Sequence, residues 1–194
     1  MNTLMLVGLI VLAVIGVLFL VTMSIYNNLV SLDQNVNSKW SEVENQYQRQ
    51  ADLIPNLISV VSSAVRVETN FTKAITDSRT RWMDAKTPLE KDAAGVEMAS
   101  GIANFMNVVA TAENYPVLQA NTQYVALTDE LAGTQNRITV ARGRYIEAIQ
   151  GYNTAIKTFP GNVFAGMFGF VEKEYYKAEP TSLTTPSLGQ GVLP

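Results

Sequence analysis

The polar cluster around Pro55 is the first candidate for chemistry in this sequence. Arg49, Asp52 and Asn56 flank this proline within about two helical turns. If the segment is helical, Pro55 offers no amide hydrogen to the carbonyl of Ala51 and crowds that group, so we expect a kink. The polar side chains could satisfy the freed carbonyl or form a binding notch, and we favour the structural role.

Arg137 and Arg142 form the second candidate group, far along the chain from Asp52. An ion pair between Asp52 and either arginine would join two helices, and this is the pairing that we predict. A pocket that gathered all three side chains around a metal ion or a substrate would instead indicate catalysis.

The sequence contains no histidine and no cysteine, which restricts the chemistry further. Without them the chain cannot form a Ser-His-Asp triad, an HExxH zinc site, a thiolate nucleophile or a disulfide. We therefore predict no enzymatic activity, no catalytic residues, no cofactor and no metal site. The 14 basic and 17 acidic residues give a net charge of -3. This balance lacks the positive patch that binds phosphate backbones, so nucleic acid is not an expected partner.

An apolar stretch near the N-terminus predicts a transmembrane anchor. Residues 4–23 carry no charge, and only Gly8, Gly16 and Thr22 interrupt the aliphatic run. Twenty helical residues cross about 30 Å of hydrocarbon. A cleaved signal peptide is the alternative, but the run is longer than such a segment and no lysine or arginine precedes it. The first basic residue is Lys39, so the charge distribution leaves the side of the membrane open.

The segment after the anchor shows an amphipathic helical stripe. Its apolar residues recur at steps of three and four, or multiples of them, from Ile25 to Val65. No turn signal appears before Lys86, so we expect one helix from the anchor to about Asp84. Anchor and first bundle helix would then move as one body.

Two further helices are predicted by their caps and periodicity. The sequence Thr87-Pro88-Leu89-Glu90 is typical of a capping box and predicts a helix start, with an end near residues 114–116. The third helix, with Asn121 as its expected N-cap, carries large residues at every seventh position: Tyr124, Leu131, Ile138, Tyr145, Tyr152 and Phe159. Such a repeat is typical of coiled-coil packing, and we expect these residues to pack against the small residues of the second helix.

The breaker Phe159-Pro160-Gly161 ends that helix and is followed by a short apolar segment, residues 163–170. This segment contains Phe164, Phe168 and Phe170 and is too short to span a bilayer. It could fold back onto the end of the bundle or enter the lipid headgroup region, and we favour folding back.

Several motifs in the same order resemble the LemA family over about residues 26–176. They are Asn28-Leu29-Val30, Trp40, Asp52-Leu53-Ile54-Pro55-Asn56-Leu57, Tyr115-Pro116, Asn136-Arg137-Ile138, Ala141-Arg142, Tyr152-Asn153, Phe159-Pro160 and Phe168-Gly169-Phe170. The resemblance implies an N-terminally anchored antiparallel helical bundle without established catalytic activity or cofactor. The sequence departs from the family at Val67-Glu68, where relatives often have a His-Glu pair.

These observations predict an all-α protein with three long helices and a short C-terminal helix. Its expected parts are a tail (1–3), a transmembrane anchor (4–23), a LemA-like bundle (24–179) and a disordered tail (180–194). We expect a bacterial single-pass protein of the inner or plasma membrane whose partners are the lipid bilayer, further copies of itself and other membrane or envelope proteins. The leading hypothesis is a self-associating scaffold or adaptor. The alternative is a sensory or ligand-binding module that signals through the kinked first helix.

Overall fold

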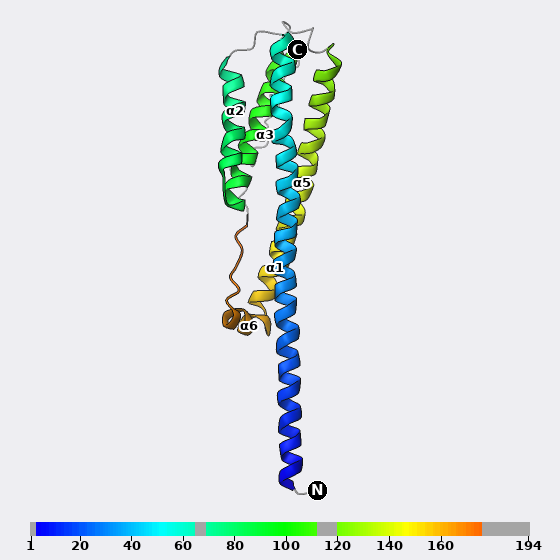
Figure 1. The fold of residues 1–194 in the computed structure, drawn as a ribbon, viewed down its shortest axis with the longest axis vertical. Helices are drawn as coiled ribbons and strands as arrows, with labels where there is room; N and C mark the ends of the chain where they lie inside the picture. Colours follow the sequence, from blue (N-terminus) through cyan, green and yellow to red (C-terminus); the bar gives the residue numbers. More distant parts are fainter. Residues whose placement is uncertain (1–2, 65–68, 112–119, 176–194) are drawn as a thin grey trace, which may run out of the picture.

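The computed structural model describes residues 3–64, 69–111 and 120–175. These residues form five helices and no strand: α1 (Thr3–Ala64), α2 (Thr69–Asp84), α3 (Pro88–Thr111), α5 (Thr122–Lys157) and α6 (Gly161–Phe168). α1 and α3 run in one direction, and α2 and α5 run in the other (Figure 1). The predicted all-α antiparallel bundle is therefore confirmed.

α1 is one unbroken helix from Thr3 to Ala64, as predicted for an anchor that continues into the bundle. Its first part projects beyond the other helices (Figure 1) and exposes its apolar side chains. Among the described helices, α1 is the one long and apolar enough to cross a membrane, judged by length and composition. The buried core begins at Leu29 and extends along α1 to Val61.

The expected continuation of the first helix to Asp84 was wrong. α1 ends at Ala64, and α2 begins at Thr69 and returns alongside the bundle (Figure 1). α2 buries Ile75 and Trp82, which continue the same helical spacing of apolar residues, so periodicity alone does not reveal two helices. Residues 65–68 lie outside the described part of the chain.

α5 lies along α1 and carries most of the predicted heptad core. Its five repeat residues from Tyr124 to Tyr152 are buried. They pack mainly against α1, as in the Trp40–Tyr145 ring contact at 5.5 Å. We expected them to pack against the helix that begins at Pro88, which is α3. Phe159 is 83% exposed, because α5 already ends at Lys157. The predicted N-cap is confirmed, since the Asn121 side chain accepts hydrogen bonds from two backbone amides of the first turn.

α2 and α3 form an antiparallel pair joined by the predicted capping box. The Glu90 amide donates to Thr87 Oγ1 at 3.2 Å, and the Thr87 amide donates to Glu90 Oε2 at 3.2 Å. This reciprocal cap explains why the chain turns here without a long loop. The predicted end of this helix at residues 114–116 and the tail at 180–194 lie outside the described residues.

Candidate functional site

The backbone next to Pro55 is bound by a residue that we did not predict from the sequence. Arg79 of α2 donates from Nε to the carbonyl oxygen of Ala51 at 2.9 Å. This is the carbonyl that Pro55 leaves without a helical donor. Asp52 and Asn56 do not fill this role; together with Pro55 they lie on the exposed face of α1. Recognising Arg79 would have required knowing that α2 is a separate helix packed on α1.

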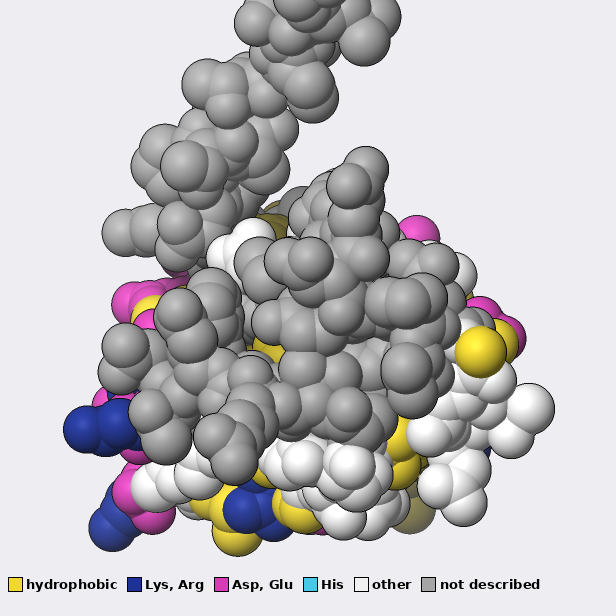
Figure 2. Space-filling model, turned by 90° about the horizontal axis from the view of Figure 1, so that it is seen from above, with side chains coloured by type: hydrophobic (Ala, Val, Ile, Leu, Met, Phe, Trp, Pro, Cys, Tyr) yellow, Lys and Arg dark blue, Asp and Glu magenta, His cyan; other side chains and the backbone are white. Residues whose placement is uncertain are grey.

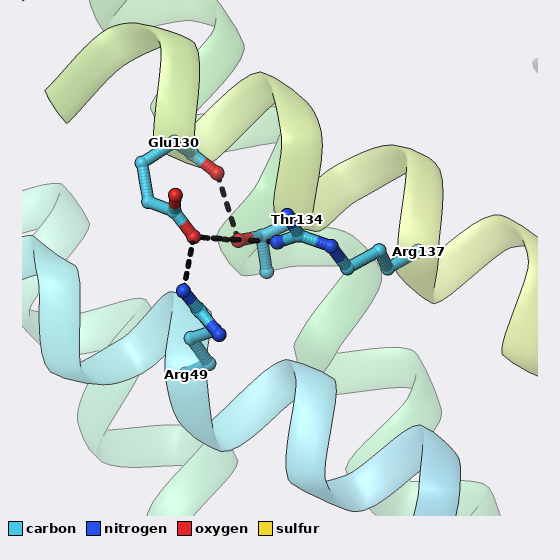
Figure 3. A network of polar contacts seen from close by, with 4 residues as sticks. All are labelled: Arg49, Glu130, Thr134 and Arg137. Carbon is cyan, nitrogen blue, oxygen red and sulfur yellow. Dashed lines mark hydrogen bonds and ion pairs between the residues drawn. The ribbon is translucent and has the colours of Figure 1, made fainter. Parts of the chain in front are cut away.

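Arg49 takes part in a polar network between α1 and α5 (Figure 3). Its guanidinium lies 2.7 Å from Glu130 Oε1, and Arg137 donates to the same oxygen at 3.3 Å. Thr134 donates to the Glu130 carbonyl at 2.8 Å. Partial burial opposes ionisation of Glu130, but the hydrogen bond from Arg137 and the charge of Arg49 hold the pKa of this carboxyl below its ordinary value. The two arginines are about half-exposed, so their ion pairs with Glu130 contribute little to stability.

Arg142 belongs to a second network, which is buried and joins three helices. It donates to Asp92 Oδ2 of α3 at 2.9 Å, and the hydroxyl of Tyr47 of α1 donates to Asp92 Oδ1 at 3.0 Å. Asp92 is 5% exposed. Burial raises the pKa of this carboxyl, although Arg142 and the Tyr47 hydrogen bond oppose the shift. Burial also raises the pKa of the Tyr47 hydroxyl, with the charge of Asp92 adding to the effect, so the hydroxyl stays a donor at neutral pH.

The predicted pairing of Asp52 with Arg137 or Arg142 is replaced by other partners. Asp52 accepts a hydrogen bond from Gln48 at 2.9 Å, one turn away on its own helix. The Trp40–Tyr145 contact sets the register of α5 against α1 and places Arg142 about two helical turns or more from Asp52. One sequence signal for the true partner existed: Asp92 continues the stripe of buried residues on α3 that contains Met98, Ile102 and Phe105.

A groove of about 580 Å³ lies between α1 and α5 beside these networks. Its lining contains acidic, basic and amide side chains: Glu42, Asn45, Gln46, Asn136, Arg137, Val140, Ala141 and Arg144. Charges of both signs could hold a zwitterionic or amide-bearing molecule. In the described part of the chain there is no group of three or more acidic, histidine or cysteine side chains that could hold a metal ion.

The phenylalanines of the predicted apolar segment gather at the base of the bundle, around α6. Phe168 packs edge-on against Tyr26 of α1 with 4.9 Å between ring centroids, and Phe170 lies 5.9 Å from the same ring. Phe164 stacks on Phe168 at 6.5 Å. The segment therefore folds back onto the bundle, as we favoured, next to the end of the apolar stretch of α1.

The chain after α6 is held against α5 and α1 by polar contacts. Gly169 adopts a left-handed conformation with φ of 75°, which ends α6 and turns the chain. The Asn153 side chain donates to the carbonyl of Lys173 at 2.8 Å and accepts from its amide at 2.9 Å. Tyr152 donates to the carbonyl of Val171 at 2.9 Å, and Lys173 Nζ lies 2.8 Å from Asp33. Neither Asn153 nor Lys173 was a candidate from sequence.

Three curated magnetosome proteins are similar to this chain. Magnetosome proteins MamQ 1 and MamQ 2 of Paramagnetospirillum magneticum are each 26% identical to it, across 87% of this chain and 72% of their own length. Magnetosome protein MamQ of Magnetospirillum gryphiswaldense is 24% identical over the same shares. A model of the LemA family matches residues 39–188, and because this match spans most of the sequence, the chain belongs to the LemA family.

Proposed function

We propose that this protein is a single-pass, membrane-anchored helical scaffold that self-associates and presents its helical surfaces to other membrane or envelope proteins. The family, the magnetosome relatives and the apolar start of α1 together indicate a membrane-associated helical protein. The scaffold role is our inference from the geometry of the bundle.

The observation that carries the proposal is the continuity of α1. The helix that would cross the membrane at residues 4–23 also contributes the core residues from Leu29 to Val61. The part beyond the anchor is about 60 Å long at 1.5 Å per residue. An unbroken helix transmits the orientation of the anchor directly to the surfaces above it, which suits a platform better than a flexible tether.

Polar contacts between helices support a rigid platform. Asp92 joins α3 to α1 and α5, and Arg79 joins α2 to α1. Figure 2 looks onto the end opposite the N-terminus and shows acidic and basic side chains next to one another at the rim. A surface of mixed charge favours protein partners over a polyanion.

The outward face of α5 is the surface that we assign to self-association. Val125 and Ile146 are exposed there, opposite the residues that pack on α1. Gly143 lies between them and lets a partner helix approach closely, since it adds no side chain.

Native mass measurement of the full chain in lipid nanodiscs tests the proposal. We expect dimers or larger assemblies, with Ile146→Glu shifting the distribution toward monomer. Met83→Glu is the matched control, because Met83 is also an exposed apolar residue but lies on α2, away from this face. A strict monomer without crosslinked neighbours in native membranes would overturn the scaffold proposal.

A ligand-binding function is the second candidate, and the groove between α1 and α5 favours it. This groove differs from the notch near Pro55 that the sequence indicated, where Arg79 already occupies the free carbonyl. Thermal unfolding in the presence of a panel of dipeptides tests this candidate. A raised melting temperature that Arg144→Gln abolishes would favour ligand binding over a purely structural groove.

A further inference from the structure

We propose that α6 and its flanking residues form a foot that rests in the headgroup layer of the membrane, as a second lipid contact besides the anchor. The inference rests on the proposed membrane anchoring. The foot consists of five apolar side chains that the bundle leaves exposed: Phe159, Val163, Met167, Phe168 and Val171. A cluster of exposed apolar side chains on a soluble surface is unfavourable unless something covers it.

The fold determines which side chains of the foot remain exposed. α6 buries Ala165 against the bundle and places Phe168 against Tyr26, so its inner side is already used for packing. The backbone carbonyl of Val171 and both backbone groups of Lys173 are bound by α5 side chains. Because the segment is held at both ends, Met167 and Val163 cannot turn inward without breaking these contacts.

The position of the foot along α1 identifies lipid as the partner that covers it. Tyr26, which touches the foot, lies one helical turn beyond Met23, where the apolar stretch ends. One turn corresponds to about 5 Å. The headgroup layer adds roughly 5–8 Å to each side of the hydrocarbon, so the foot and this layer share the same level. Figure 1 shows α6 beside α1 at the level where α1 emerges from the bundle toward its N-terminus.

The contact that we infer is apolar and does not depend on lipid charge. The two lysines beside the foot already have acidic partners: Lys157 pairs with Glu172, and Lys173 pairs with Asp33. Short apolar helices at an interface insert their apolar side about 5–10 Å into the headgroup and acyl boundary. The foot should therefore bind neutral phosphatidylcholine as well as anionic lipid. This contact would fix the tilt of the bundle relative to the membrane. With a single anchor, the bundle would be free to rotate.

The absence of native cysteine permits a direct test with single spin labels on the full chain. Cysteine would replace Met167 in the foot, Leu12 in the anchor and Val140 on α5, which are 70%, 70% and 54% exposed. Each labelled protein is placed in phosphatidylcholine nanodiscs, and collisions with oxygen and with a water-soluble nickel chelate are measured. We expect the oxygen-to-nickel ratio at 167 to exceed that at 140 by roughly threefold or more, because oxygen partitions into apolar surroundings. A label at Val163 repeats the test, and circular dichroism checks each fold.

The possible outcomes separate the foot from the anchor. If position 12 is in lipid and positions 163 and 167 match position 140, the foot is refuted and the anchor stands. If position 12 itself is aqueous, the proposed membrane anchoring fails and the foot fails with it. Strong spin–spin coupling at 167 without excess oxygen collisions would mean that a second copy covers this surface, which also overturns lipid contact.

Discussion

Arg79 of α2 donates a hydrogen bond from Nε to the carbonyl oxygen of Ala51 at 2.9 Å, across the gap between two helices. Pro55 deprives this carbonyl of its helical donor, so an arginine from another helix replaces the missing amide. Ala51 is fully buried, which makes an unsatisfied oxygen there costly. The contact explains how α1 passes through a proline without ending.

Arg79→Met should therefore destabilise the bundle, because it keeps the aliphatic stem and removes only the donor. The expected loss is about 1–3 kcal/mol in the free energy of unfolding, measured with denaturant. In a Pro55→Ala background the new alanine amide can donate to Ala51, so the same arginine change should cost distinctly less. Equal costs in the two backgrounds would show that Arg79 does not substitute for the missing amide.

Gly95→Ala should destabilise the protein through Tyr47. A Cβ atom at position 95 would lie 2.6 Å from Tyr47 Cζ, so the ring has to move and its hydrogen bond to Asp92 is strained. We expect a loss of about 1–3 kcal/mol in the free energy of unfolding, the usual effect of overfilling a packed core.

Gly101→Ala on the same helix is the matched control. Its added Cβ would meet only Ser78 Oγ, at an ordinary 3.9 Å. Alanine is the better helix former, so this change should raise stability by about 0.5–1 kcal/mol. Similar destabilisation by both changes would mean that α3 as a whole, and not the Tyr47 contact, is sensitive to substitution.

The two carboxylates that join the helices should respond to pH in opposite directions. The pKa of Glu130 is lowered from 4.5, so its contribution to stability is present above that value and disappears as the pH falls through the folded pKa. The pKa of Asp92 is raised from 3.8, so its contribution is present below that value and is lost as the pH rises through the folded pKa.

Unfolding measured from about pH 3 to about pH 7 checks both signs. The stability difference between the wild type and Glu130→Gln should shrink as the solution becomes more acidic. The wild type should lose stability relative to Asp92→Asn as the pH rises through the same region. If the stability differences for the two variants changed with pH in the same direction, the pKa shifts assigned to Glu130 and Asp92 would be contradicted.

Local sequence signals predicted local structure well in this chain. The heptad from Tyr124 to Tyr152, the capping box at Thr87 and the N-cap at Asn121 each depend on residues within one helix, and the structure contains all of them. The family and the all-α class followed from motif order and periodicity. Left-handed supercoiling of this heptad stays a prediction.

The interhelical contacts could not be read in the same way. The stripe of apolar residues passes from α1 into α2 without change of period, so the reversal of the chain left no signal in the pattern. The partners of Arg142 and Arg79 depend on which helices are neighbours. An arginine reaches any acceptor within its length, and only the register of the bundle decides which one is near.

Asn153→Asp gives a sensitive test of how the segment after α6 is held. The Asn153 amide pairs with both backbone groups of Lys173, and the side chain is buried. Aspartate has nearly the same shape but cannot donate to the Lys173 carbonyl, and its charge would face that oxygen. We expect the Lys173 amide to exchange hydrogen at least about tenfold faster, which corresponds to about 1.4 kcal/mol.

The core amides of α1 and α5 should keep their exchange rates, because Asn153 lies near the end of α5 and away from Tyr47. Asn136→Asp, on the exposed face of the same helix, is the control and should leave the exchange of the Lys173 amide unchanged. Uniform acceleration over the whole bundle would show that Asn153 supports the core as a whole. Faster exchange limited to Lys173 would instead identify a local clamp.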